Sequence, residues 1–376
     1  MLAIEVSLAL IVVGGTASAV VYHLASAPQA LPSGAPSSAG VPSGGVPSGA
    51  PSSGALAAGT PSGAPAGAPS SGALPYQAGP ASNGSSATQA PGDCIMVPHT
   101  CGFPDATNTG VPSGMVLRSV PSQVSSGSGW SYNAADKDVV VTVDGTVLSG
   151  LSIPCNLVID ASNVTVQDVE VVTGGNFGIS LTHTTGVTIE DSTISGQNLT
   201  SGRVDSAIDD VYGDSTGIVI KNNNISRFRT GVQISTGMIT GNYIHDPGYI
   251  PGDHTNGIYV GGTTEPLTIY GNTIFNDLGQ TDDINLDAST SGQAVANKYV
   301  VDNLLAGGGY SIYGGGARNG RTSNIVIEDN DFGRLYYQKG GRYGAAAYVN
   351  QQQSGNVWSG NVLSGTRPPA TPATAS

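Results

Sequence analysis

Apolar and polar residues alternate with a period of two over short runs between about residues 140 and 365. Val and Ile dominate these runs, and a polar turn interrupts each run near its middle. A period of two is typical of β-strands, so each run predicts two short strands joined at a bend. The repeated runs are VTVQDVEV from Val164, VTIEDSTI from Val187, IVIKNNNI from Ile218, MITGNYI from Met238, LTIYGNTI from Leu267, KYVVDNLL from Lys298, IVIEDNDF from Ile325 and NVWSGNVL from Asn356.

The last six repeats carry Asn at the same bend, at intervals of 19 to 31 residues. Asn tolerates the left-handed backbone that a sharp bend requires, and its amide can bond to the next Asn one strand spacing away. A constant turn with variable intervals places the insertions on one side of each coil. The pattern predicts an all-β domain, a single-stranded right-handed parallel β-helix of about eight coils with an asparagine ladder. The ladder residues are Asn223, Asn242, Asn272, Asn303, Asn330 and Asn361.

A third strand follows each variable insertion, with apolar residues directed inward and polar residues outward. The expected outward residues form a surface row of polar and aromatic groups beside the variable loops. This row comprises Ser180, Asp209, Gln233, Tyr259, Asn285, Tyr313 and Tyr348.

These repeats resemble the pectate-lyase-like superfamily of right-handed β-helices, over about residues 140 to 365. The segments GFPDATNTGVPSG and GDHTNGIYVGG are also similar to exported β-helix repeat proteins of actinobacterial type. The resemblance implies that a substrate lies along the third-strand row, under the loops that precede it. The chain has HTNG before DD but lacks the GHG and RIK segments of polygalacturonase-like enzymes, and it lacks the Arg-based motifs of the lyases. No catalytic residue is therefore carried over from the superfamily.

The regions outside the repeats have a different composition. Residues 1–27 contain an apolar stretch that ends in Ala-Ser-Ala, which predicts a cleaved signal peptide or, as the alternative, an uncleaved N-terminal anchor. Residues 28–92 read as a disordered Pro/Gly/Ser/Ala linker, and residues 366–376 as a disordered tail. The β-helix domain is expected at residues 93–365, in a secreted or cell-surface protein.

Three cysteines, Cys94, Cys101 and Cys155, predict one disulfide in the N-terminal cap of an exported chain. The sequence does not select the pair, although Cys155 alternates with Leu157 and Ile159 and so suits an inward position.

The formal net charge of −13 disfavours nucleic acid as a partner. The expected partner is an extracellular polysaccharide or a surface glycan, bound by a monomer that contacts membrane only through an uncleaved N-terminus. A polyuronate would need a basic patch or a bridging cation such as Ca²⁺.

Two insertions on neighbouring coils, residues 245–257 and 276–287, carry most of the candidate chemistry. The candidate catalytic residues are Asp253, His254, Asp282 and Asp283. In an elimination, His254 would remove the C5 proton of a uronic acid while Ca²⁺ neutralises its carboxylate. The expected calcium ligands are Asp282, Asp283 and Asp287.

In a hydrolysis, Asp253 and one of the two later aspartates would flank the scissile bond. In a third interpretation, the acidic segments form only a solvent-exposed loop face or a structural cation site, and they catalyse no reaction. We also expect substrate contacts from the third-strand row and from the basic loop GRLYYQKGGRYG. These residues are Asn256, Tyr259, Asn285, Tyr313, Tyr348 and Arg342.

The sequence therefore predicts a carbohydrate-active protein that acts on an extended polysaccharide by elimination or hydrolysis. The alternative is a non-catalytic β-helix that displays a glycan-binding or adhesive face.

Overall fold

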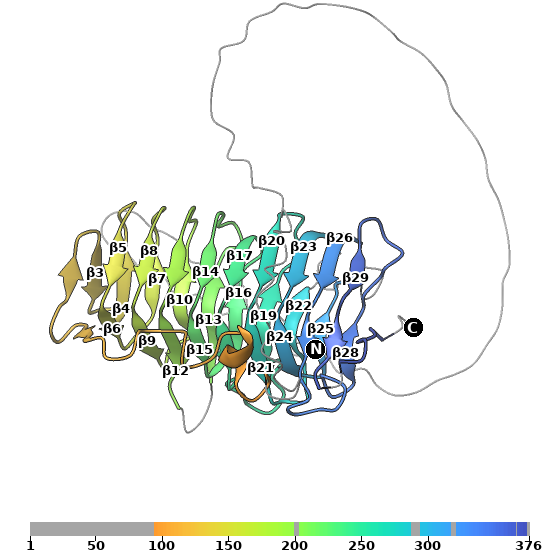
Figure 1. Cartoon of the computed structure of the whole chain (residues 1–376). Helices are drawn as coiled ribbons and strands as arrows, with labels where there is room; N and C mark the ends of the chain where they lie inside the picture. Colours follow the sequence, from red (N-terminus) through yellow and green to blue (C-terminus); the bar gives the residue numbers. More distant parts are fainter. Residues whose placement is uncertain (1–93, 199–202, 287–293, 317–320, 366, 374–376) are drawn as a thin grey trace, which may run out of the picture. The chain divides into compact units, whose positions relative to one another are not determined.

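The structure, a computed structural model, describes residues 94–198, 203–286, 294–316, 321–365 and 367–373. In these residues the chain folds as a parallel β-helix of about seven turns, one fewer than we predicted (Figure 1). The right-handed all-β fold class is confirmed. The expected leader and linker, residues 1–92, lie outside the described residues, as does Asp287.

Each turn of the helix contributes one strand to each of three sheets. The nine-stranded sheet contains β5 (Val147–Ser149), β8 (Thr165–Gln167), β11 (Thr188–Glu190), β14 (Val219–Lys221), β17 (Gly237–Thr240), β20 (Leu267–Tyr270), β23 (Val295–Val301), β26 (Thr322–Glu328) and β29 (Val357–Ser359).

The chain then bends into the ten-stranded sheet. It contains β1 (Arg118–Ser119), β6 (Leu151–Ile153), β9 (Glu170–Thr173), β12 (Thr193–Gly196), β15 (Asn224–Ser226), β18 (Tyr243–His245), β21 (Thr273–Asn276), β24 (Leu304–Gly307), β27 (Asp331–Phe332) and β30 (Val362–Leu363).

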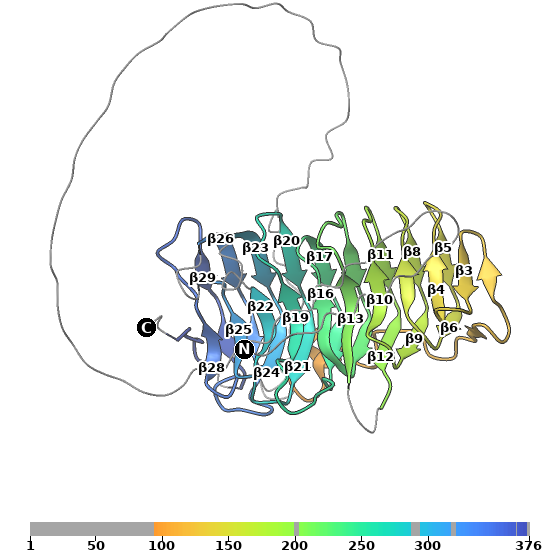
Figure 2. The same ribbon diagram turned by 180° about the vertical axis from the view of Figure 1, so that it is seen from behind.

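The variable loops lead into the eleven-stranded sheet, which closes each turn (Figure 2). It contains β2 (Ser126–Gly127), β3 (Trp130–Asn133), β4 (Asp138–Val141), β7 (Leu157–Ile159), β10 (Phe177–Leu181), β13 (Val204–Asp210), β16 (Phe228–Gln233), β19 (Asn256–Val260), β22 (Asp282–Leu286), β25 (Tyr310–Tyr313) and β28 (Gly344–Ala347). Only β2, β3 and β4 pair antiparallel, at the N-terminal end of this sheet.

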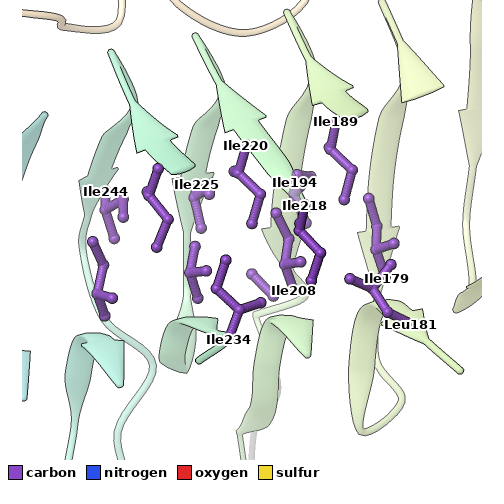
Figure 3. Packing of buried hydrophobic residues seen from close by; sticks show 14 of the residues in the cluster. Ile179, Leu181, Ile189, Ile194, Ile208, Ile218, Ile220, Ile225, Ile234 and Ile244 are labelled. Carbon is purple, nitrogen blue, oxygen red and sulfur yellow. The ribbon is translucent and has the colours of Figure 1, made fainter. Parts of the chain in front are cut away.

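The core is a column of aliphatic side chains that alternate along every strand and stack from one turn to the next (Figure 3). Ile194, Ile225 and Ile244 occupy paired positions on β12, β15 and β18. Burial of such side chains is the main favourable term for a fold with few charged residues.

The asparagine ladder lies at the bend between the nine-stranded and ten-stranded sheets. All six predicted Asn side chains are buried. The Oδ1 of Asn272 accepts from the backbone N and the Nδ2 of Asn242 at 3.0 and 2.9 Å, and the same pair of bonds recurs along the ladder. At the N-terminal end, the backbone N of Ser192 donates to Asn223, and the ladder stops at the apolar Val169.

One detail of the predicted bend is wrong. The left-handed residue is the one before each ladder Asn, such as Asn222 or Asp302 (φ 55° and 54°), or a Gly such as Gly271. The preceding residue takes up the turn, which leaves the ladder Asn free to direct its amide inward.

Residues 94–117 form a strap along the outside of the ten-stranded sheet. A disulfide between Cys94 and Cys101 encloses the short 3₁₀ helix η1 (Pro98–Cys101). Ile95 packs against Phe275, Leu304 and Ala306. The predicted single disulfide is confirmed, and Cys155 packs against the core.

The C-terminal segment closes the last turn. The backbone N of Ala370 donates to Asn361 and that of Ala373 donates to Ala346, at 2.9 and 2.8 Å. The indole of Trp358 donates to the Ala370 carbonyl at 3.0 Å. Residues 367–373, which the sequence analysis assigned to the tail, therefore satisfy backbone groups that the final turn would otherwise expose.

We predict that Asn303→Ala lowers the free energy of unfolding by about 1–3 kcal/mol, because it leaves buried partners on both sides unsatisfied. Chemical denaturation monitored by circular dichroism measures the change. The control Asn176→Ala, at an exposed position, should change stability by less than about 0.5 kcal/mol. Equal stability of the two variants would contradict the role of the ladder.

Candidate functional site

The third strands place one side chain per turn in a row on the outside of the eleven-stranded sheet, which we call the outer row. Strand register pairs Ser180 with Asp209, Asp209 with Gln233, and so on toward the C-terminus. The outer row comprises Ser180, Asp209, Gln233, Tyr259, Asn285, Tyr313 and Ala347.

Tyr348 is not in this row, because the register pairs Tyr313 with Ala347. Tyr348 follows the end of β28 with a left-handed backbone (φ 58°). Its ring nevertheless stacks on Tyr313, with 5.6 Å between the ring centroids. Tyr348 therefore lies beside Tyr313, but it is one residue beyond the position that the strand register pairs with Tyr313.

Four tyrosines gather at this end of the outer row, and we call them the tyrosine cluster: Tyr310, Tyr313, Tyr343 and Tyr348. The Tyr310 ring centroid lies 5.7 Å from that of Tyr313 and 5.8 Å from that of Tyr343. Tyr343 and Tyr348 keep 56% and 42% of their surfaces exposed. The cluster therefore offers ring surface to a ligand.

Arg342 extends the tyrosine cluster with a positive charge. Its guanidinium carbon lies 5.5 Å from the centroid of the Tyr343 ring. Its side chain also lies close to Gly279, in the loop before β22. The basic loop thus meets the second candidate insertion.

Only part of the predicted acidic cluster comes together. The Asn285 amide donates to Asp282 at 3.0 Å and lies 3.5 Å from the Asn256 Oδ1, so these three side chains meet on the outer side of the sheet. Asp282 is fully buried there. His254 is exposed beside them, at the end of the 246–255 loop.

Asp253 is turned away from this group. Arg203 binds its two carboxylate oxygens at 2.8 and 3.1 Å, and the backbone N of Ile250 donates to it at 3.0 Å. Arg203 also contacts Asp205, which in turn pairs with Arg229. Asp253 therefore anchors the 246–255 loop and has no free oxygen for catalysis.

Asp283 points into the core. It belongs to a row of small inward residues, which we call the small-residue row: Gly178, Ala207, Gly231, Gly257, Asp283, Ser311 and Ala345. At Gly257 an added Cβ would meet Ile274, which shows that this row faces inward. Neither oxygen of Asp283 has a hydrogen-bond partner of good geometry.

Burial raises the pKa of Asp283 well above its usual range, and the nearby Ser311 hydroxyl offsets this only in part. A fully buried carboxyl in apolar surroundings keeps its proton. Asp283 is therefore not a substrate-facing base. Because Asp282 and Asp283 point to opposite sides of β22, they do not form the predicted calcium site together. The described residues contain no group of three or more His, Cys, Asp or Glu side chains suited to a metal.

Asp209 is an acidic group of the outer row that we had not selected as catalytic. Burial raises its pKa to about 6, and the neighbouring Asp210 and Asp205 add to this while Arg229 opposes it. In the sequence, the adjacent acids of DSAIDDVY were the only sign of a possible catalytic role for Asp209. They did not indicate that residues from neighbouring coils would bury its carboxyl.

No family model matches the chain, and no match was found among the curated proteins or the solved structures compared with it.

We predict that Asp283→Ser raises the melting temperature at pH 7, because it removes a buried carboxyl that costs about 1–3 kcal/mol. Ser311 shows that the row accepts this side chain. The pKa of Asp283 is raised on folding, so its contribution to stability is complete below the ordinary pKa of about 3.9 and is lost as the pH rises.

The gain should therefore be larger at pH 7 than at pH 4, as measured by thermal unfolding at both values. The exposed Asp277→Ser is the matched control and should change neither melting temperature. A gain from Asp283→Ser that is the same at both pH values would show that the carboxyl does not titrate as described.

Proposed function

We propose that the outer row and the tyrosine cluster bind an extended polysaccharide. The observation that carries this proposal is the cluster of four tyrosine rings, partly exposed, at the end of a polar row on a rigid sheet. A tyrosine ring offers an apolar face to a sugar ring, while its hydroxyl remains available for hydrogen bonds. Residues on rigid strands hold such contacts in fixed positions.

The shape of the site supports an extended ligand. The outer row has one side chain per turn, at the strand spacing of about 4.8 Å, over seven consecutive strands from β10 to β28. Gln233, Tyr259 and Asn285 continue the row away from the tyrosine cluster. A linear polymer can contact several of these positions at once, which multiplies weak individual contacts.

Binding without chemistry is better supported than elimination or hydrolysis by the residues we first selected. Asp253 is held by Arg203, Asp283 faces the core and Asp282 is fully buried. Of the four predicted catalytic residues, only His254 is exposed. A base without an accessible acid or cation does not complete either reaction.

Hydrolysis through Asp209 is the second candidate function. Its pKa of about 6 suits a general acid near neutral pH, and it lies in the outer row, where 5% of its surface is exposed, so a substrate would reach it only if the residues that cover it move. Asp209→Asn should then abolish the release of reducing ends, while the variant still binds the polysaccharide through the tyrosine cluster.

The proposed location is the outside of the cell, with residues 1–27 as the export signal or anchor and residues 28–92 as a spacer. The Cys94–Cys101 disulfide supports an oxidising compartment. Among the described residues, no helical segment has the length and apolarity of a membrane span.

We predict that Tyr313→Ala and Tyr348→Ala each weaken polysaccharide binding about tenfold, because each variant removes one ring of the stacked pair. Affinity electrophoresis against a panel of soluble polysaccharides measures retardation of the intact chain. Tyr270→Ala, on the outside of the nine-stranded sheet, is the matched control and should bind like wild type. Equal binding by all three variants would show that the polysaccharide does not bind at the tyrosine cluster.

The same incubations separate binding from catalysis. Unsaturated products raise the ultraviolet absorbance if elimination occurs, and reducing ends appear without that absorbance if hydrolysis occurs. We expect retardation with neither signal, with or without EDTA. A signal lost on Asp209→Asn would establish the second candidate.

A further inference from the structure

A pocket lies at the corner between the ten-stranded and eleven-stranded sheets, under the 246–255 loop. It encloses about 260 Å³ together with its mouth. Ile225, Ile244, Phe228 and Phe275 supply most of its apolar wall. We call it the corner pocket.

Two glycines of the small-residue row, Gly231 and Gly257, line the corner pocket, and the neighbouring Ile side chains and backbone leave no room for a Cβ at either position. A Cβ at Gly231 would lie 2.8 Å from the Ile244 Cγ2, and one at Gly257 would lie 2.4 Å from the Ile274 Cγ2. Of the other turns, one carries Gly178 in this row and the rest carry Ala, Asp or Ser. The loop of residues 246–255 contributes Pro247 to the pocket, whereas the preceding turn makes the same corner with Arg227 alone between β15 and β16.

The uncharged polar side chains of the pocket already have protein partners. His245 contacts Asn224 at 2.9 Å and Asp246 at 2.8 Å. Asn276 donates to the Asp282 carbonyl at 3.1 Å, and the Asn256 amide faces the His254 carbonyl. Burial lowers the pKa of His245, which keeps its ring neutral at neutral pH. Arg227, whose side chain is exposed to solvent, also lines the pocket, and the rest of the lining is apolar or already hydrogen-bonded within the protein.

Asn256 connects the corner pocket with the outer row. It lines the corner pocket and also contacts Asn285, which stands next to Tyr313 in the outer row. A polymer lying on the outer row therefore passes the mouth of the pocket. Part of the 260 Å³ is the open mouth, so the enclosed space is small and suits one substituent rather than a whole oligosaccharide.

We propose that the corner pocket holds an uncharged apolar substituent, an acetyl group or a methyl ester, on a sugar of the bound polysaccharide. This inference rests on the proposed function and specifies its ligand class. A substituted chain would place its apolar group among the Ile and Phe side chains while its sugar rings remain on the polar row. Removal of the substituent would leave that apolar surface in water, at a cost in affinity.

The test compares matched polysaccharides in a solid-phase binding assay with the intact chain. Xylan, glucomannan and pectin are used in native ester-bearing form and after alkaline de-esterification. A chitin hexamer is paired with its de-N-acetylated form. We expect at least fivefold tighter binding to the substituted member of a pair.

Pro247→Phe narrows the mouth and should remove this preference while leaving binding of the unsubstituted form unchanged. Pro251→Phe, an exposed position in the same loop, is the matched control and should keep the preference. Melting temperatures establish that both variants fold. If Pro247→Phe does not fold, Ser226→Leu narrows the pocket from β15 and replaces it.

The outcomes separate the two proposals. If both members of every pair bind equally, and binding still depends on Tyr313, the corner pocket does not hold a substituent. The proposal that the outer row and the tyrosine cluster bind polysaccharide would remain supported. A preference that survives Pro247→Phe or Ser226→Leu would also show that the corner pocket does not hold a substituent. Binding of no member of the panel would overturn the proposed function and this inference with it.

Discussion

The asparagine ladder is the interaction on which the rest of this molecule depends. Each interior amide of the ladder, such as Asn272, accepts from the backbone N and the side chain of the previous turn, and it donates to the next turn and to a core carbonyl. An unpaired buried amide is costly, so the turns must stack in one register. With one corner fixed in this way, the differences in turn length fall in the loops before and after the strands of the eleven-stranded sheet.

That constraint explains why the candidate site lies where it does. Strands that start from a common corner bring Tyr259, Asn285 and Tyr313 into one row although they are far apart in the sequence. The loops before β19, β22 and β28 lie beside that row. They carry His254, Gly279 and Arg342, respectively. The corner pocket lies under the first of these loops, and Gly231 and Gly257 are among the residues that line it.

The repeat alone predicted the strands, the ladder and all but one member of the outer row, because a period of two and a recurrent Asn are local signals. Side-chain direction near the start of the third strands was not predictable in this way. Asp282 and Asp283 are adjacent acids in a polar segment, yet one faces outward and the other faces the core. The partner of Asp253, Arg203, is 50 residues away, and no local pattern indicates it. Lys298, which opens one repeat, is fully buried because three oxygens from two neighbouring turns surround its ammonium group.

The central claim is that one face of the β-helix, the outer row with its tyrosine cluster, binds an extended glycan. Hydrogen–deuterium exchange of the intact chain, with and without a saturating polysaccharide that retards it, tests this directly. The account predicts slower exchange in the loops that flank β19, β22, β25 and β28, and no change in the nine-stranded sheet. Protection confined to the nine-stranded sheet or to the strap of residues 94–117 would contradict it.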